Sequence, residues 1–355
     1  MTEKDAGSNC RVNMRVNLGG LEMHNPITVA SGTFGSGREY AELWKKTACS
    51  EGILLNEPEP EAGRERISET QSLAHGVLSH KRATPLSALG ALTTKGVSLV
   101  PWEGNDTPRI AETASGMLNS IGLQNKGVEA FCADDLVWLK ENASDVPVIV
   151  NVCGHGIGEY ASVIERLERE KAVSAYEINI SCPNVGSGGM SFGTDPKIAA
   201  EVTARCRKVT TRPLIVKLTP NVTDITVIAR AVEDEGADAL SLINTVTGMA
   251  IDAQTKRPLL ARVQGGLSGP AIKPIALYAV YRCYQAVSIP LLGMGGIAQA
   301  TDAIEFFLAG ATAVAVGTTH FSNPLCTFRL AHEIEMWCES QGVKDINELT
   351  GGLLL

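Results

Sequence analysis

The sequence of 355 residues has no run of about 18 apolar residues, the length that a membrane-spanning helix needs. Its first residues, Met1 to Asn9, are polar and contain no apolar core of the kind that signal peptides carry. Basic residues are in the minority, with a formal net charge of -8, whereas nucleic-acid-binding proteins present a basic surface. These absences argue against a membrane span and predict a cytoplasmic protein whose main partner is not a nucleic acid.

The cysteines form no recognisable motif. They number nine, with no Cys-x-x-Cys pair, and they are Cys10, Cys49, Cys132, Cys153, Cys182, Cys206, Cys283, Cys326 and Cys338. An odd and scattered set argues against a disulfide framework, a zinc site or an iron–sulfur cluster held by this chain alone. We therefore expect most of these side chains to be reduced thiols in the core.

Short apolar segments alternate with amphipathic ones through most of the chain. Hydrophobic residues make up 44% and charged residues 20%, which is typical of a soluble globular enzyme. Period-2 patterns predict strands at 25–32, 90–96, 146–151, 175–181, 213–218, 239–244, 289–293 and 312–317. Helical patterns predict helices at 38–47, 127–142, 157–171, 195–209, 223–236, 271–287, 300–309 and 324–341.

This alternation indicates a parallel sheet, and eight repeats indicate an α/β fold of the (β/α)8 TIM-barrel type. An open doubly wound sheet would carry Gly-x-Gly-x-x-Gly after its first strand, and none is present there. We predict one barrel domain over 11–355, preceded by a disordered segment 1–10. A hairpin around Gly19-Gly20 is expected to cover the base of the barrel. Residues 56–88, after the first strand and helix, are predicted to be a surface insertion, either a solvated loop or a lid or partner contact.

The stretch from Glu177 to Val185 is a strand that ends in a polar loop. Glu177 and Asn179 alternate with apolar residues, and Pro183 ends the strand. A lone cysteine such as Cys182 is more often a small core residue than a catalyst, but amides flank this one at a strand end. The small residues 186–189 that follow predict a movable lid. Residue parity also predicts an ion pair between Glu177 and Lys217.

Other polar residues stand at the C-terminal ends of the predicted strands, where barrel enzymes hold their active sites. They include Ser31, Thr94, Lys95, Asn151, Asn179, Asn184, Lys217, Asn244 and Thr245. Two lysines and several amides, without a cluster of His, Asp or Glu, argue against a divalent metal. The glycine-containing loops at 293–296 and 317–319 follow strands seven and eight, the usual phosphate site of this fold. The set suits a flat, polar, anionic ligand.

Several of these segments together resemble class 1 dihydroorotate dehydrogenase, most closely class 1B, the catalytic subunit of the NAD-dependent enzyme. The segments are Asn25-Pro26 through Ala30-Ser31-Gly32-Thr33-Phe34-Gly35, Thr94-Lys95-Gly96, Asn119-x-x-Gly122-Leu123-x-Asn125, Asn179-Ile180-Ser181-Cys182-Pro183-Asn184 and Gly293-x-Gly295-Gly296. The resemblance covers nearly all of 11–350 apart from the insertion. It implies oxidation of (S)-dihydroorotate to orotate in de novo pyrimidine (UMP) biosynthesis.

The resemblance also implies one FMN per chain, which takes a hydride at N5 while Cys182 takes the C5 proton. The implied FMN-binding residues are Ala30, Ser31, Thr94, Lys95, Asn151, Asn179, Lys217, Ile243, Gly269, Gly295, Gly296, Gly317 and Thr318. The implied residues for dihydroorotate or orotate are Lys95, Asn119, Ile121, Gly122, Leu123, Asn179, Asn184, Asn244 and Thr245.

Class 1B enzymes have a partner subunit with FAD and a 2Fe–2S cluster that passes electrons to NAD. By resemblance, this chain forms a homodimer that joins two such partners in a heterotetramer. The insertion departs from the family and leaves open how the partner docks and which acceptor is used. Alternatives from the residues are a flavin-dependent dihydropyrimidine dehydrogenase barrel, a Schiff-base aldolase using Lys217, and a barrel that only binds a ligand.

Overall fold

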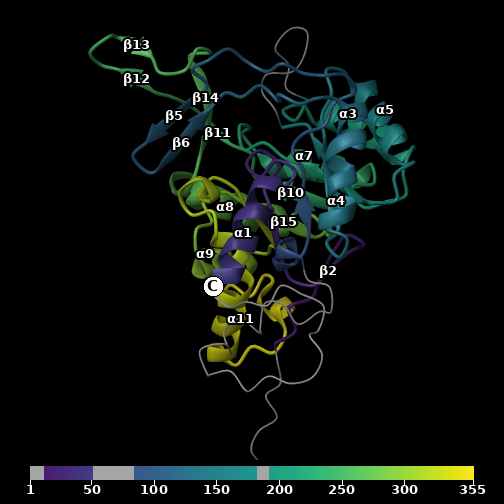
Figure 1. Cartoon of the computed structure of the whole chain (residues 1–355), viewed down its shortest axis with the longest axis vertical. Coiled ribbons are helices and arrows are strands. Elements are labelled where there is room, and N and C mark those ends of the chain that lie inside the picture. Colours follow the sequence, from purple (N-terminus) through teal and green to yellow (C-terminus); the bar gives the residue numbers. More distant parts are fainter. Residues whose placement is uncertain (1–11, 51–83, 182–191) are drawn as a thin grey trace, which may run out of the picture.

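The computed structural model describes residues 12–50, 84–181 and 192–355 (Figure 1). The predicted disordered segment and most of the predicted insertion lie outside these residues. The described end of the insertion is a 3-10 turn, η2 (Pro85–Ala88), in which Leu86 is fully buried. The predicted surface loop therefore ends before Leu86, because this apolar side chain packs into the core.

Eight parallel strands form a barrel, as predicted. In chain order they are β3 (Ile27–Val29), β4 (Leu92–Thr93), β7 (Val148–Val152), β8 (Val173–Asn179), β9 (Leu214–Lys217), β10 (Ala239–Leu242), β15 (Leu291–Met294) and β16 (Ala313–Val316). Neighbours in sequence are neighbours in the sheet. The first and second strands meet through the Gly90 N–H, which donates to the Ile27 carbonyl at 2.8 Å, and through the hydroxyls of Thr28 and Thr93, 3.1 Å apart.

The barrel strands are buried on both faces because helices cover the outside and side chains fill the inside. Every residue of β7 and β9 is buried. The register aligns Asn179 of β8 with Lys217 of β9, and Lys217 with Ser241 of β10. Paired residues on parallel strands point to the same side of a sheet, so this register gathers polar side chains inside the barrel.

The helices are α1 (Arg38–Ser50), α3 (Val128–Ala130), α4 (Leu136–Asn142), α5 (Ile157–Leu167), α6 (Pro196–Arg207), α7 (Ile225–Asp234), α8 (Lys273–Tyr284), α9 (Ala300–Leu308), α10 (Thr319–Ser322) and α11 (Cys326–Gln341). Two short turns are η4 (Pro270–Ile272) and η5 (Ile346–Leu349). Asp195 and Asp224 cap α6 and α7 by accepting hydrogen bonds from the first free N–H groups. No helix in the described ranges is both long and apolar enough to cross a membrane.

One predicted helix contains an irregularity. The helix expected over 127–142 includes a π-helical turn, η3 (Phe131–Asp135), between α3 and α4. Arg38, at the start of α1, donates to Asp134 of this turn at 2.6 Å. Ser36 donates to the neighbouring Asp135 at 2.7 Å. The turn therefore presents two carboxylates to the same neighbouring segment.

The predicted hairpin lies across the base of the barrel. Its strands are β1 (Val16–Leu18) and β2 (Leu21–Met23). A Cβ atom at Gly19 would lie 2.2 Å from the carbonyl oxygen of Asp238, directly before β10, so the turn touches the N-terminal end of a barrel strand. Leu18 is fully buried, which completes the core at this end.

An antiparallel arm stands over the other end of the barrel and was not predicted from the sequence (Figure 1). Its strands are β5 (Ile110–Thr113), β6 (Gly116–Asn119), β11 (Val246–Met249) and β14 (Gln264–Ser268), with a ribbon of β12 (Ile251–Asp252) and β13 (Arg257–Pro258). The central pairing joins β6 to β14, with Asn119 opposite Gly266. Such pairing between distant segments leaves no local periodic pattern.

Candidate active site

A cavity of about 250 Å³ opens at the C-terminal ends of the barrel strands, beneath the arm. It is lined by nearly all of the predicted site residues that the structure describes: Ala30, Ser31, Lys95, Asn119, Ile121, Gly122, Leu123, Asn151, Asn179, Lys217, Ile243, Asn244, Thr245, Gly269, Gly295, Gly296, Gly317 and Thr318. These residues come from every part of the chain, and the barrel brings them to one place.

Thr94 is the exception among the described residues. Its side chain is buried and does not line the cavity. Its hydroxyl donates to the Lys95 carbonyl at 3.0 Å and accepts from the Asn151 N–H at 3.4 Å. The Thr94 side chain therefore faces the sheet and not the opening. Its hydrogen bonds hold the backbone of two residues that do line the cavity, Lys95 and Asn151.

Cys182 and Asn184 lie outside the described residues, as does the predicted lid at 186–189. The last described residue before them is Ser181, which is buried at the end of β8. The roles of Cys182 and Asn184 stay predictions.

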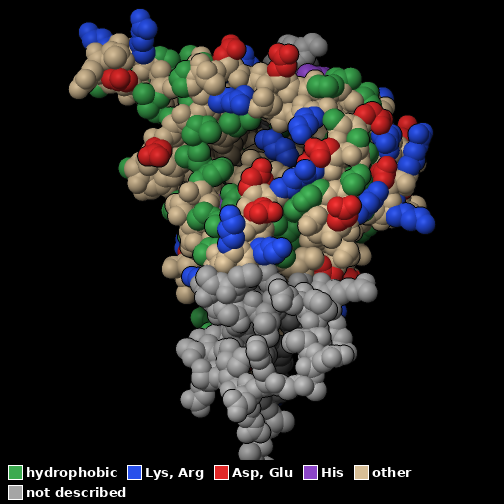
Figure 2. Space-filling model, in the orientation of Figure 1, with side chains coloured by type: hydrophobic (Ala, Val, Ile, Leu, Met, Phe, Trp, Pro, Cys, Tyr) green, Lys and Arg blue, Asp and Glu red, His purple; other side chains and the backbone are tan. Residues whose placement is uncertain are grey.

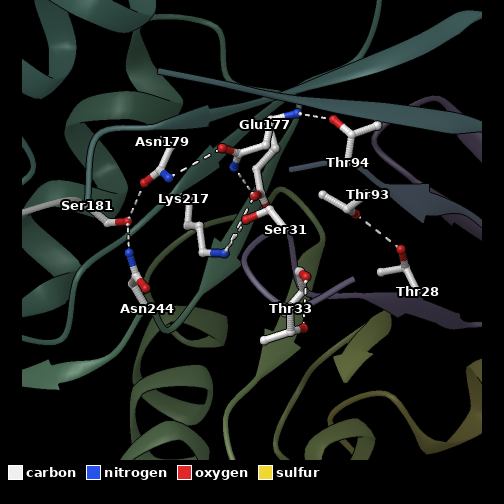
Figure 3. A network of polar contacts seen from close by, with 12 residues as sticks. Thr28, Ser31, Thr33, Thr93, Thr94, Glu177, Asn179, Ser181, Lys217 and Asn244 are labelled. Carbon is white, nitrogen blue, oxygen red and sulfur yellow. Dashed lines mark hydrogen bonds and ion pairs between the residues drawn. The ribbon is translucent and has the colours of Figure 1, made fainter. Parts of the chain in front are cut away.

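The predicted ion pair is present in the barrel. The Lys217 ammonium lies 3.5 Å from the Glu177 carboxylate, and the two side chains are 5% and 1% exposed. Lys217 also donates to the Ser31 hydroxyl at 3.4 Å (Figure 3). A buried charge needs such partners, because an unpaired one is strongly destabilising. The pair supplies one fixed cation at the floor of the cavity.

Hydrogen bonds connect the polar side chains at the end of β8 (Figure 3). Asn151 donates to Glu177, and Asn179 donates to Asn151 at 3.3 Å. Ser181 donates to Asn179 at 2.8 Å, and Asn244 donates to Ser181 at 2.6 Å. We call Glu177, Asn151, Asn179, Ser181 and Asn244 the polar network; it links strands β7 and β8 to the loop after β10.

Glycines line the cavity at the two loops for which the sequence predicts a phosphate site. Gly295 and Gly296 have φ values of +128° and +82°, and a Cβ at Gly296 would lie 2.8 Å from Lys273. Only glycine fits there without strain. The Asp302 carboxylate accepts from the N–H groups of Ala298 and Gln299, at 2.9 and 3.1 Å, and so holds the next part of this loop.

Lys273 lies beside this loop but is already paired. Its ammonium lies 2.7 Å from Asp302 and 2.9 Å from Glu305. The Lys273 ammonium therefore fixes the position of the Asp302 carboxylate, which holds the loop. Because Lys273 is paired in this way, the backbone N–H groups of the loop are the groups best suited to bind a phosphate. After the last strand, β16, the Thr318 hydroxyl donates to Ser268 of the arm at 2.8 Å.

The arm supplies cavity residues that sequence reasoning missed. They include Ile110, Met117, Gln264, Gly265, Gly266 and Ser268. Asn119 donates to the Gly266 carbonyl at 3.3 Å, which joins a predicted residue to the unpredicted strand β14. The signal that could have found this strand is the glycine-containing run 264–269, since backbones approach ligands closely at glycine.

Within the described part of the chain, no three His, Cys, Asp or Glu side chains group together in a way that could hold a metal ion. The cavity instead presents one buried cation, several amides and a glycine-lined wall. This set suits a flat ligand with carbonyl groups and a phosphate.

Comparisons with known proteins agree with this geometry. A family model described as dihydroorotate dehydrogenase matches residues 75–337. The chain is 48% identical over 340 residues to a Pelobacter propionicus protein named dihydroorotate dehydrogenase B (NAD(+)), catalytic subunit, covering 96% of this chain and 98% of that protein. Proteins of the same name from Alkaliphilus oremlandii and Geotalea daltonii are 48% and 46% identical, covering 97% and 96% of this chain and 99% and 98% of theirs.

Proposed function

Because the chain belongs to the dihydroorotate dehydrogenase family, we propose that its cavity is where dihydroorotate is oxidised to orotate, as in the B-type catalytic subunits. This is a step of pyrimidine biosynthesis, with NAD+ as the final acceptor. The observation that carries the proposal is the convergence of Lys217, the asparagine side chains and the glycine loops on one cavity. Family membership favours this reaction over the dihydropyrimidine dehydrogenase and aldolase alternatives.

FMN is the proposed cofactor, and the cavity residues fit it. Gly295, Gly296, Gly317 and Thr318 would hold its phosphate, because their backbone N–H groups stand at loops that leave room for one. The ring system would be held by residues of the other walls, namely Ala30, Ser31, Lys95, Asn151, Asn179, Lys217, Ile243 and Gly269. When bound, FMN supplies the acceptor for the substrate hydride.

The substrate is proposed to lie against the roof formed by the arm. Asn119, Asn179 and Asn244 bring amides to this side of the cavity, together with Lys95, Ile121, Gly122, Leu123 and Thr245. Gly122 and Leu123 have φ values of 75° and 56°, so the backbone bends sharply beside the cavity. Asn184 belongs to the same proposal. Amide N–H groups and a lysine suit a ligand with a carboxylate and ring carbonyls.

Cys182 is the proposed base that removes the C5 proton. It follows Ser181, which the polar network holds at the end of β8. Only the thiolate accepts a proton, and an ordinary thiol has a pKa near about 8.5. Turnover is therefore expected to rise as the pH becomes alkaline.

We also propose a larger assembly. The relatives are named catalytic subunits of an NAD+ enzyme, which supports a partner subunit carrying FAD and a 2Fe–2S cluster. Apolar side chains of the arm are about half exposed, including Ile110, Met249, Ile251 and Val263. Figure 2 shows hydrophobic side chains on the surface of this part of the molecule. Such a surface supports contact between two copies of this chain. Two partner subunits bound to this dimer would make the proposed heterotetramer. Six cysteines among the described residues are buried and form no disulfide, which supports a location in the reducing cytoplasm.

The test is a visible spectrum of the full chain with FMN, before and after anaerobic dihydroorotate. We expect flavin absorbance that bleaches on addition. In Cys182→Ala, flavin and orotate binding should persist, while the rate of bleaching should fall by about 10²–10⁴ because the base is missing. Cys206→Ala, which removes a buried thiol of α6, is the matched control and should bleach at the normal rate. Absorbance that dihydroorotate leaves unchanged would contradict the proposed substrate, and near-normal bleaching by Cys182→Ala would contradict the role of this cysteine.

A further inference from the structure

Glu177 is almost fully buried and is not part of the cavity lining. Its side chain is 1% exposed and does not line the cavity, although Asn151 and Lys217, its two partners, both do. Any effect of Glu177 on a ligand must therefore pass through its neighbours. The Glu177 carboxylate is the only charged group in the polar network, and Glu177 lies at one end of that network.

The carboxylate determines the direction of every hydrogen bond in the network. An ionised carboxylate only accepts, so Asn151 must turn its NH2 group toward Glu177. The Asn151 side-chain oxygen then faces Asn179, so Asn179 must donate a hydrogen bond to it from its own NH2 group. The Asn179 oxygen in turn accepts from the Ser181 hydroxyl, whose oxygen accepts from Asn244. Figure 3 shows Asn179, Ser181 and Asn244 in this succession.

This direction decides what the cavity presents to a ligand. The side-chain oxygens of Asn151 and Asn179 are engaged inside the network, and the Asn244 oxygen accepts from the Thr245 N–H at 2.9 Å. Each NH2 group has two hydrogens and uses one of them in the network. The amides therefore retain mainly N–H donors for the cavity.

We propose that Glu177 is a positioning residue, which acts through Asn151 to orient Asn179 and Asn244 so that they present N–H donors to an anionic, carbonyl-bearing ligand. The proposal rests on the proposed function, in which this ligand is dihydroorotate or orotate. A neutral glutamine at the same position both donates and accepts. It would allow the reversed direction, in which amide oxygens face the acceptor groups of the ligand and repel them.

The experiment measures orotate binding to the FMN-loaded full chain by isothermal titration calorimetry. Glu177→Gln is expected to weaken orotate binding about 10- to 100-fold. Ser181→Ala, which cuts the network beyond Asn179 and leaves the ion pair intact, is expected to weaken it about tenfold. The double variant should be no weaker than Glu177→Gln alone, because both changes act through the same network.

The matched control is Thr93→Val. Thr93 is a buried barrel residue whose hydroxyl contacts Thr28, outside the polar network. We expect it to cost similar stability to Ser181→Ala, with orotate affinity unchanged. FMN affinity, followed by flavin fluorescence, should change less than about threefold in Ser181→Ala.

Three outcomes would overturn the inference even if the wild-type chain binds orotate and so supports the proposed function. They are normal orotate affinity in Glu177→Gln, additive losses in the double variant, and equal affinity in Ser181→Ala and Thr93→Val. If Glu177→Gln does not fold, the comparison of Ser181→Ala with Thr93→Val decides. A wild-type chain that binds FMN but no orotate would instead contradict the proposed function.

Discussion

His320 illustrates how one buried side chain holds a loop that lines the cavity. It is 1% exposed and lies between the loop after β16 and helix α11. Its Nδ1 lies 3.1 Å from the Gly317 carbonyl oxygen, and its Nε2 lies 2.8 Å from the Thr327 hydroxyl. A carbonyl only accepts, so Nδ1 carries the proton and Nε2 accepts from Thr327. The neutral ring thus ties Gly317 to the core.

The burial of His320 leads to a prediction about the stability of the protein at acidic pH. Burial lowers the pKa of His320 from 6.5 to about 4. Between these values the unfolded chain binds the proton and the folded protein does not, so stability is lost as the pH falls through this window. From about pH 7 to about pH 4.5 this histidine should remove roughly 2–3 kcal/mol from the free energy of unfolding.

His320→Gln should remove this contribution, because glutamine donates and accepts without titrating. Denaturant unfolding at the two pH values measures it. The nearby Tyr40 and Cys326 have raised pKa values and stay neutral throughout this window. His155→Gln, at an exposed histidine stacked on Trp102, is the control. An unchanged pH dependence in His320→Gln would contradict the assignment.

At the scale of elements, the antiparallel arm turns an open barrel mouth into a cavity with a roof. Strand β14 pairs with β6 on one side and β11 on the other. Gly266 stands opposite Asn119 in this sheet. A Cβ atom at Gly266 would lie 1.9 Å from the Thr245 hydroxyl oxygen, so the roof and the loop after β10 are in direct contact.

Gly266→Ala should therefore separate β14 from Thr245. We expect orotate affinity to fall more than about tenfold, since a displacement of about 1 Å in a binding site is costly. FMN affinity should change less, because a methyl group at Gly266 would meet Thr245 and not the glycine loops after β15 and β16. Calorimetry with each ligand measures both.

Gly248→Ala is the matched control in the same sheet. There the new methyl group would meet the end of the Leu118 side chain at 3.1 Å, which is able to move, and the Leu267 Cβ at 3.5 Å, an ordinary van der Waals contact. Equal orotate affinity in the two glycine variants would show that the arm does not position the substrate.

At the scale of the whole molecule, the two ends of the described chain hold each other. The Asn13 N–H donates to the Lys344 carbonyl at 2.8 Å, and the Ile346 N–H donates back to Asn13 at 2.9 Å. The Asn347 side chain donates to the Arg15 carbonyl at 2.8 Å. Ile346 is also buried in the core. The C-terminal segment is therefore part of the base of the barrel.

Removal of residues 344–355 should destabilise the protein by roughly 3–6 kcal/mol, mainly through the lost burial of Ile346 and Leu349. Removal of 353–355 alone should change the free energy of unfolding by less than about 0.5 kcal/mol, since Leu354 and Leu355 are 95% and 99% exposed. Denaturant unfolding of the two truncated forms measures the difference. Similar stability of both forms would show that the terminal contacts contribute little.

Much of the barrel and of its site was predictable from the sequence. Each barrel strand and its following helix carry a local period, and strand ends on one side of a barrel meet by construction. Residues as far apart as Ser31 and Gly317 were therefore assigned to one site before the fold was known. The pairing of Glu177 with Lys217 followed from residue parity on adjacent strands.

The tertiary structure alone decided the rest. The arm forms because β6 meets β14, a pairing between segments far apart in the chain that no local pattern records. Thr94 does not line the cavity, and its hydroxyl instead bonds the Lys95 carbonyl and the Asn151 N–H. The direction of the polar network depends on where one carboxylate lies relative to three amides. Periodicity sets which residues point inward, whereas hydrogen-bond direction is set by contacts between strands.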